Sequence, residues 1–305
     1  ATFRDTIGDT PQKNDRLTHP DGADQMASLE YNLFRCKLIK PEQRDLFPDN
    51  LTPAELFIAA INARPSGELR LGYTWHIGNL THFNTTTGYF AVGRTTSSTV
   101  SKFDQESGNF VEEKQDASPY THCVFDADIG LLGIAKNTRL APTTYGVAAN
   151  LQRLLSETDP IRHNHITVEI QPIPDPEEFL KAIQNAYSVS SFTATFRGPN
   201  PFDADEIFQK PLSVYLSKAN GVTGKTMIKG EDLDREVLTG VSRSTAATGN
   251  RASARIKRNK NAKPRTIHMK TRPAGLTYDE EQPSPKAVLK DIKSIYGEVR
   301  RDKRK

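Results

Sequence analysis

Hydrophobic and polar positions change their period several times along the chain, and each period predicts a different element. The apolar run Tyr31–Ile39 predicts a strand. The segment Thr52–Ile61 predicts a helix, because Thr52 suits the N-cap and Pro53 suits the first helical position. Glu55 follows three residues after the cap and completes a capping box.

From Gly67 to Lys136 the chain consists of short runs rich in Thr, Tyr, Phe and Val, interrupted by Gly and Asn. Such runs, separated by turn signals, predict an antiparallel meander. The runs are Leu69–Ile77, Gly88–Thr95, Thr99–Phe103, Asn109–Glu113, Thr121–Phe125 and Gly130–Ala135.

Beyond Leu140 the pattern alternates between helix and strand. The elements expected in order are a helix from Pro142 to Leu155, a strand His165–Ile170, a helix Asp175–Tyr187 and a strand Val189–Phe196. Two βα crossings beside a hairpin predict an α+β fold in which helices cover one face of a mixed sheet, close to a split βαβ arrangement.

The region after Phe196 predicts a second hairpin and more helix. Leu212–Lys218 has a strand-like composition, Asn220-Gly221 is a strong hairpin turn, and a partner strand follows to about Lys229. A helix is expected from near Glu231. At the C-terminus, Ser284-Pro285 starts an amphipathic helix with a narrow apolar stripe that consists of Val288, Ile292, Ile295 and Val299. This stripe packs either on the chain's own core or on a dimer or partner.

These patterns divide the chain into five regions. They are a polar arm (1–28), a mainly β half (29–138), an α+β half (139–236), a basic segment (237–278) and the C-terminal helix (279–305).

Composition limits the classes of protein that the chain can belong to. Its 305 residues suffice for two ordinary domains, no stretch is apolar enough to span a bilayer, and the N-terminus lacks an apolar signal region. We therefore expect a cytoplasmic protein. Cys36 and Cys123 are too few and too far apart for a disulfide framework or a zinc knuckle.

The formal net charge of +4 conceals an uneven distribution. Residues 1–236 hold 23 Lys and Arg against 31 Asp and Glu, whereas residues 237–278 hold ten basic residues and no acidic one. Such a segment on an acidic body predicts a polyanionic partner, and double-stranded DNA bound with little sequence preference is the favoured one. The ten residues are Arg243, Arg251, Arg255, Lys257, Arg258, Lys260, Lys263, Arg265, Lys270 and Arg272.

Within this segment, the i, i+4, i+7 spacing of Arg251, Arg255 and Arg258 predicts one row of cations on a helix. The residues after it, interleaved with Asn, Pro and Gly, predict a flexible strap that follows a phosphate backbone. Two alternatives remain: a solvated linker, or an internal clasp that pairs with acids of the body.

An enzyme acting on nucleotides or nucleic acid is the competing hypothesis. Residues 219–226 fit a permissive phosphate-loop pattern that ends in Lys225 and Thr226, although the residues that follow are poor helix formers. His163 and His165, with other histidines, offer a candidate metal site, but no Cys or paired carboxylate lies near them in the sequence. We therefore assign no catalytic residue, metal or cofactor.

The order of elements resembles that of the RexA-type phage-exclusion proteins over roughly residues 65–260. The resemblance is sharpest at Pro142-Thr143-Thr144 and in the strand Ser191–Phe196. It implies a cytoplasmic, DNA-binding, dimer-forming sensor in antiviral defence by abortive infection, which acts through a separate effector protein. The long polar start and the basic segment depart from that pattern, so no functional residue is carried over from it.

Overall fold

The computed structural model describes residues 28–39, 51–197, 208–279 and 283–300. The fold is α+β, as the sequence predicts, and every strand pair among these residues is antiparallel. The polar arm expected over residues 1–28 lies outside the described residues except for its last residue.

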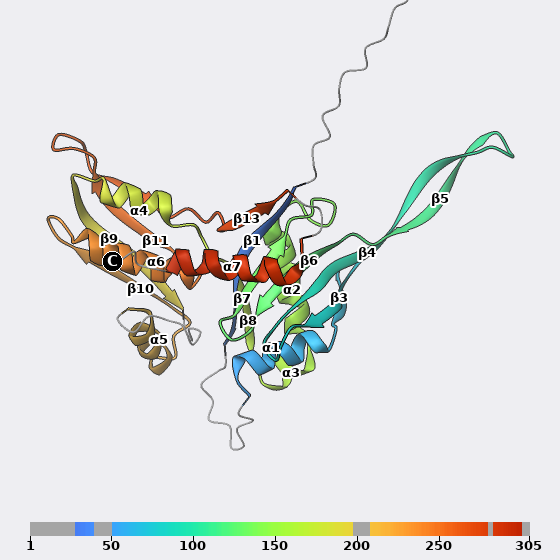
Figure 1. Cartoon of the computed structure of the whole chain (residues 1–305), viewed down its shortest axis with the longest axis horizontal. Coiled ribbons are helices and arrows are strands. Elements are labelled where there is room, and N and C mark those ends of the chain that lie inside the picture. The colour runs from blue at the N-terminus through green and yellow to red at the C-terminus, as the bar shows by residue number, and fades with distance from the viewer. Residues whose placement is uncertain (1–27, 40–50, 198–207, 280–282, 301–305) are drawn as a thin grey trace, which may run out of the picture.

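A nine-stranded sheet, here called the large sheet, forms the centre of the molecule (Figure 1). Its main order is β13-β1-β7-β6-β4-β3-β2, while β5 pairs with β4 and β8 pairs with β1. The bounds are β1 (Leu29–Ile39), β2 (Ser66–Arg70), β3 (Tyr73–His82), β4 (Thr87–Asp104), β5 (Asn109–Ala117), β6 (Tyr120–Asp126), β7 (Leu131–Ala135), β8 (Thr167–Pro172) and β13 (Gly275–Tyr278).

The predicted antiparallel meander is confirmed, with two differences in its strands. The run expected over Leu69–Ile77 is divided by a turn between β2 and β3, and two runs expected separately merge into the 18 residues of β4. The outer part of β4 pairs with β5 alone, so the two strands project as a long hairpin.

The helices that lie between β1 and β8 in the sequence cover one face of the large sheet. They are α1 (Pro53–Asn62), α2 (Thr144–Ser156) and α3 (Asp159–His163). The predicted capping box at Thr52 is present, with Glu55 N donating to Thr52 Oγ1 and Thr52 N donating to the Glu55 carboxylate. Apolar side chains of α1 and α2, including Leu56 and Leu151, join Phe34 of β1 in the first hydrophobic core.

The split βαβ arrangement expected from the sequence is also present. Phe34 and Arg35 of β1 each have one partner on β7 and another on β8, so these two strands lie on opposite edges of β1 and run parallel to each other. The chain passes between them through α2 and α3. The expected mixed sheet is not observed, because β1 separates the two parallel strands and each adjacent pair is antiparallel.

A second, four-stranded sheet, here called the small sheet, has the order β10-β9-β11-β12. Its strands are β9 (Ser188–Arg197), β10 (Thr223–Lys229), β11 (Ala252–Lys257) and β12 (Arg265–His268). The helices nearest to it are α4 (Glu177–Gln184), α5 (Gln209–Lys218) and α6 (Arg235–Ala247). The second crossing, from β8 through α4 to β9, therefore leads into a different sheet.

Helix α7 (Pro285–Arg300) lies against the large sheet, with one end beside α6 (Figure 1). Three residues of its stripe are buried, with Val288 and Ile292 fully inaccessible, and Ile295 is partly buried. The stripe shares the second hydrophobic core with β1, β6, β7 and the small sheet. Gly133 of β7 permits the close approach, because a Cβ atom there would lie 2.1 Å from Ile292 Cδ1. Of the two alternatives for this stripe, the chain's own core is therefore the one observed.

The predicted strand Leu212–Lys218 is wrong, since these residues belong to α5. Its exposed Val214 and Tyr215 favour a strand by composition, but the buried positions are Gln209, Ser213 and Leu216, which follow helical spacing. The predicted turn at Asn220-Gly221 ends this helix instead of joining two strands. Asn220 has φ 51° and Gly221 N donates to Leu216 O at 2.8 Å, as at a helix C-terminus.

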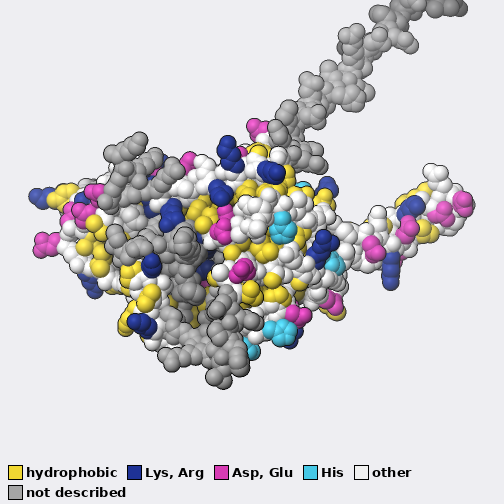
Figure 2. All heavy atoms as spheres, turned by 60° about the horizontal axis from the view of Figure 1, so that its bottom comes forward, with side chains coloured by type: hydrophobic (Ala, Val, Ile, Leu, Met, Phe, Trp, Pro, Cys, Tyr) yellow, Lys and Arg dark blue, Asp and Glu magenta, His cyan; other side chains and the backbone are white. Residues whose placement is uncertain are grey.

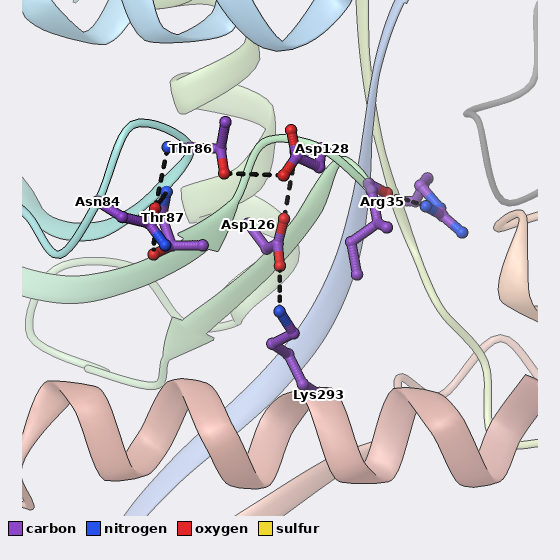
Figure 3. A network of polar contacts seen from close by, with 8 residues as sticks. Arg35, Asn84, Thr86, Thr87, Asp126, Asp128 and Lys293 are labelled. Carbon is purple, nitrogen blue, oxygen red and sulfur yellow. Dashed lines mark hydrogen bonds and ion pairs between the residues drawn. The ribbon is translucent and has the colours of Figure 1, made fainter.

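A buried arginine on β1, Arg35, connects the large sheet to α6 and α7. Figure 3 shows this side chain on β1 and, separately, the Asp126–Lys293 ion pair. Arg35 is 0% exposed, and its Nε and Nη2 donate to Ala247 O at the end of α6 at 3.0 and 2.7 Å. The same guanidinium donates to Ile129 O in the β6–β7 turn and, at 2.5 Å, to Tyr296 Oη of α7. Beside it, Lys293 Nζ of α7 lies 2.5 Å from the buried Asp126 carboxylate.

We expect Arg35→Ala to lower the free energy of unfolding by about 3 kcal/mol or more, because several buried acceptors lose their donor together. Urea denaturation measures this change. Arg153→Ala, at an exposed position on α2, is the control and should change it by less than about 0.5 kcal/mol. Equal effects of the two substitutions would contradict a central role for Arg35.

Lys37, also on β1, should make the free energy of unfolding depend on pH. Burial lowers its pKa to about 7 from the ordinary 10.5, with Arg35 adding to the shift and Glu169 opposing it. Between these two values the unfolded chain binds a proton that the folded chain does not, so stability rises with pH by about 1.4 kcal/mol per unit. The destabilisation is complete below pH 7 and absent above pH 10.5.

Lys37→Met should remove this contribution. The difference between wild type and variant in free energy of unfolding, measured in urea at pH 7, 8 and 9, should shrink as pH rises. Lys290→Met, which changes an exposed lysine of α7, should show a constant difference over the same range.

Candidate nucleic-acid interface

The small sheet has one face in the second hydrophobic core and one open face. In β9, Phe192, Ala194 and Phe196 are at most 4% exposed. The positions between them face the other side of the sheet, because side chains alternate along a strand, and they are the hydroxyl residues Ser191, Thr193 and Thr195. The open face of β9 is thus made of small side chains that can donate hydrogen bonds.

Strand β11 shows the same alternation and corrects the predicted helical row. Ala252, Ala254 and Ile256 are buried, so Ser253 and Arg255 face outward. The helix predicted for this segment is wrong, because burial follows a period of two, as in a strand. The buried positions are mostly alanines, and alanine is also a strong helix former, so the sequence alone does not reveal this period. Arg251 and Arg255 still share a face, whereas Arg258 lies beyond the end of the strand.

The register brings two lysines of β10 opposite these arginines. Lys229 pairs with Ser191, which pairs with Arg255. Lys225 pairs with Thr195. Thr195 N donates to Arg251 O at 2.9 Å, and Arg251 N donates to the Thr195 hydroxyl at 2.9 Å. Each row therefore runs from a lysine across a hydroxyl residue to an arginine.

These four cations mark the corners of an area of about 13 by 10 Å, given strand rise and spacing. Three of them, Lys225, Lys229 and Arg255, line a depression of about 540 Å³, whereas Arg251 lies outside its lining. The other lining residues are Ser190, Ser191, Thr193, Met227, Ser253, Ala254 and Thr266. Cationic corners around a floor of hydroxyl donors can bind an extended polyanion such as a phosphate backbone. We call this surface the basic face.

Among the residues that the structure describes, no acid pairs with the four corner cations of the basic face. None of the strands β9, β10, β11 and β12 contains an Asp or Glu. Over the parts of the chain that the structure describes, no carboxylate lies within 4.0 Å of the charged nitrogens of Lys225, Lys229, Arg251 or Arg255.

The other predicted residues are distributed around this sheet. Lys257 is half-buried at the end of β11, and Arg258, Lys260 and Lys263 are exposed in the loop between β11 and β12. This loop joins two paired strands, so the residues that follow Arg258 form a hairpin of the small sheet and not the flexible strap that the sequence predicts.

Three further residues lie on the side of the small sheet that carries α4. Arg265, Lys270 and Arg272 line a second depression there, together with α4. Lys270 Nζ is 2.5 Å from the Glu178 carboxylate, and this hydrogen bond lowers the pKa of Glu178.

Arg243 stands apart from all the others because it is buried in α6. Its Nη2 lies 2.7 Å from the Glu177 carboxylate of α4, and its Nη1 donates to Glu298 O of α7 at 3.1 Å. Arg243 and Lys270 thus pair with two successive acids of α4. These two residues therefore match the alternative in which the basic segment is an internal clasp that pairs with acids of the body.

Sequence reasoning missed Lys225 and Lys229 as members of the basic face. It placed them in a phosphate-loop pattern or a separate hairpin, because they lie outside the acid-free segment. The available signal was the alternation Lys225, Met227, Lys229 with smaller residues between them, which predicts a strand with one cationic face.

The phosphate-loop arrangement expected as an alternative at residues 219–226 is not formed. Such a loop follows a strand and precedes a helix, whereas here α5 precedes and β10 follows. Gly224 serves packing instead, since a Cβ atom there would lie 2.1 Å from Phe196 Cζ. Thr226 Oγ1 donates to Ala194 O at 3.4 Å, within the sheet.

The histidines are not brought together. His163 ends α3, and His165 lies in the following turn with φ 50°, not on the predicted strand. No group of three or more His, Cys, Asp or Glu side chains that could hold a metal ion occurs among the residues described.

Comparison with known proteins gives no assignment: no protein-family model matches the chain, and no curated protein matches it. Within the described ranges, no helix is long and apolar enough to cross a membrane.

Because Arg243 is buried and Arg255 is exposed, their replacement should affect the free energy of unfolding differently. We expect Arg243→Ala to lower the free energy of unfolding by about 3 kcal/mol, because it leaves Glu177 and the end of α7 without a buried partner. Arg255→Ala should change it by less than about 0.5 kcal/mol. Urea denaturation of both variants measures this, and a large loss for Arg255→Ala would mean that the residue is structural.

Proposed function

We propose that this chain is a non-enzymatic nucleic-acid-binding protein whose basic face contacts phosphates of double-stranded DNA. The observation that carries the proposal is the set of four cations on one side of the small sheet, for which the described part of the chain supplies no acidic partner. Like charges held this close repel one another, so a bound polyanion relieves an unfavourable interaction as well as gaining contacts. The β11–β12 loop adds the exposed cations Arg258, Lys260 and Lys263 at the end of this sheet.

The chemistry of the basic face favours binding with little sequence preference. Lysine ammonium groups and small hydroxyls are typical partners of phosphate oxygens, which carry no sequence information. Neither Asn nor Gln, the usual partners of adenine, lines the depression. The protein therefore reads charge and backbone shape more than base identity.

The biological setting in this proposal rests on the resemblance to RexA-type phage-exclusion proteins alone. In that setting the chain acts in the cytoplasm as a sensor or adaptor of a bacterial or prophage defence system. It binds DNA as a homo-oligomer and passes a signal to a separate effector protein.

The direct test is the affinity for unrelated DNA duplexes as a function of salt concentration. We expect similar affinities for all sequences and a steep decrease with salt, because each neutralised phosphate releases a counterion. RNA duplexes of the same length, measured in parallel, test the choice of nucleic acid. A flat salt response, or no binding at about 50 mM salt, would overturn the proposal.

Replacing the four corner cations should reduce both the affinity and its salt dependence. In the variant Lys225→Gln, Lys229→Gln, Arg251→Gln and Arg255→Gln, we expect the slope of log K against log salt to fall by about four. Fluorescence anisotropy with a labelled duplex measures the slope.

The matched control replaces four exposed cations away from the basic face. It carries Arg153→Gln, Arg162→Gln, Lys286→Gln and Lys290→Gln, all outside the small sheet. The net charge changes equally in the two variants, so a general charge effect predicts equal losses. The proposal requires the control to retain the wild-type slope within about one unit.

A further inference from the structure

The projecting hairpin formed by residues 96–117 has a long strand edge without a partner. Every residue of β5 is exposed, and β5 pairs with no strand other than β4 among the described residues. Nine register pairs run from Thr96–Ala117 to Asp104–Asn109 at the tip. A two-stranded ribbon alone is marginally stable in water, and an exposed edge is a template for another strand.

The composition of this hairpin indicates what kind of partner covers it. It carries five acidic residues against Lys102 and Lys114, and Figure 2 shows acidic side chains along the projection. A nucleic acid is therefore repelled, whereas a basic surface is attracted. Near the tip, Phe103 and Phe110 stack edge to face at 5.2 Å and remain 50% and 79% exposed.

The small sheet supplies a basic edge of matching length. Its outer strand β10 pairs only with β9, so its other edge is open in the described structure. β10 has seven residues and β5 has nine. Lys225 and Lys229 lie four positions apart on one face of this edge strand.

The acids of β5 have the same spacing as these lysines. Glu112 and Asp116 lie four positions apart, and alternation places them on one face of the strand, about 13 Å from each other. Their neighbour Glu113 points to the opposite face, where its carboxylate lies 3.8 Å from Lys102 Nζ. The spacing matches in either strand direction, and the antiparallel pairing is slightly the more stable.

We propose that the hairpin of one copy of this chain adds to the β10 edge of a second copy, with Glu112 and Asp116 beside Lys225 and Lys229. The backbone groups of β5 and β10 then complete a ladder, and the paired charges select the register. The partner is a second copy because the chain itself contains both the acidic edge and the complementary basic edge.

The test is sedimentation velocity of the full chain over a range of concentrations, without nucleic acid. Wild type should assemble as concentration rises. We expect the arm variant, Glu112→Lys with Asp116→Lys, and the sheet variant, Lys225→Glu with Lys229→Glu, each to weaken assembly at least about tenfold.

Mixing the two variants separates this contact from any other association. In an equimolar mixture, the basic arm of one variant meets the acidic edge of the other, and the acidic arm meets the basic edge. Assembly should therefore return to near the wild-type level. A mixture that stays as monomers would overturn the proposal, as would a wild type that is monomeric at its highest soluble concentration.

A single-residue comparison provides the matched control. Glu112→Lys and Glu113→Lys change adjacent residues of β5 by the same charge, but on opposite faces. Only Glu112→Lys should weaken assembly, and equal effects would show that general charge drives it. The arm variant also keeps the four corner cations, so its affinity for DNA tests the proposed function independently of assembly.

Discussion

The buried guanidinium of Arg35 is the interaction on which the arrangement of the two sheets depends. It lies on β1, which itself pairs with β7, β8 and β13, and it donates to α6, α7 and the β6–β7 turn. A charged group without water is stable only when fixed acceptors surround it. The carbonyl of Ala247 and the hydroxyl of Tyr296 are such acceptors, so their helices are held at one distance from the large sheet.

This arrangement leaves the small sheet with two unlike faces. One face packs against α6 through small and apolar side chains such as Ala254 and Phe192, which share a core with α7. The other face carries cations whose nearest strand neighbours are serines and threonines. Acids that neutralise basic residues are present on α4, but they serve Arg243 and Lys270 on the covered side. Among the described residues, both of these ion pairs thus lie on the covered side of the sheet, and no ion pair involves the four corner cations of the open face.

The acidic hairpin and the basic face are complementary surfaces within one chain. The hairpin projects from one side of the large sheet. The basic face belongs to the small sheet, which lies on the opposite side of the molecule (Figure 1). Both expose strand edges that natural proteins usually cover or protect with charge. The lysines of β10 therefore have two roles in our proposals: they contact phosphate on the open face and they select the strand that extends the sheet.

The sequence by itself determined the elements whose signals are local. The capping box at Thr52 specified α1, closely spaced turns specified the meander, and a regular apolar stripe specified α7. Only the tertiary structure decided that α5 is a helix and that Arg255 lies on β11, with Arg251 directly before that strand, because the burial that selects each period comes from distant segments. Lys229 and Arg255 both pair with Ser191, which lies 38 residues before the lysine and 64 residues before the arginine. No local sequence pattern encodes this pairing.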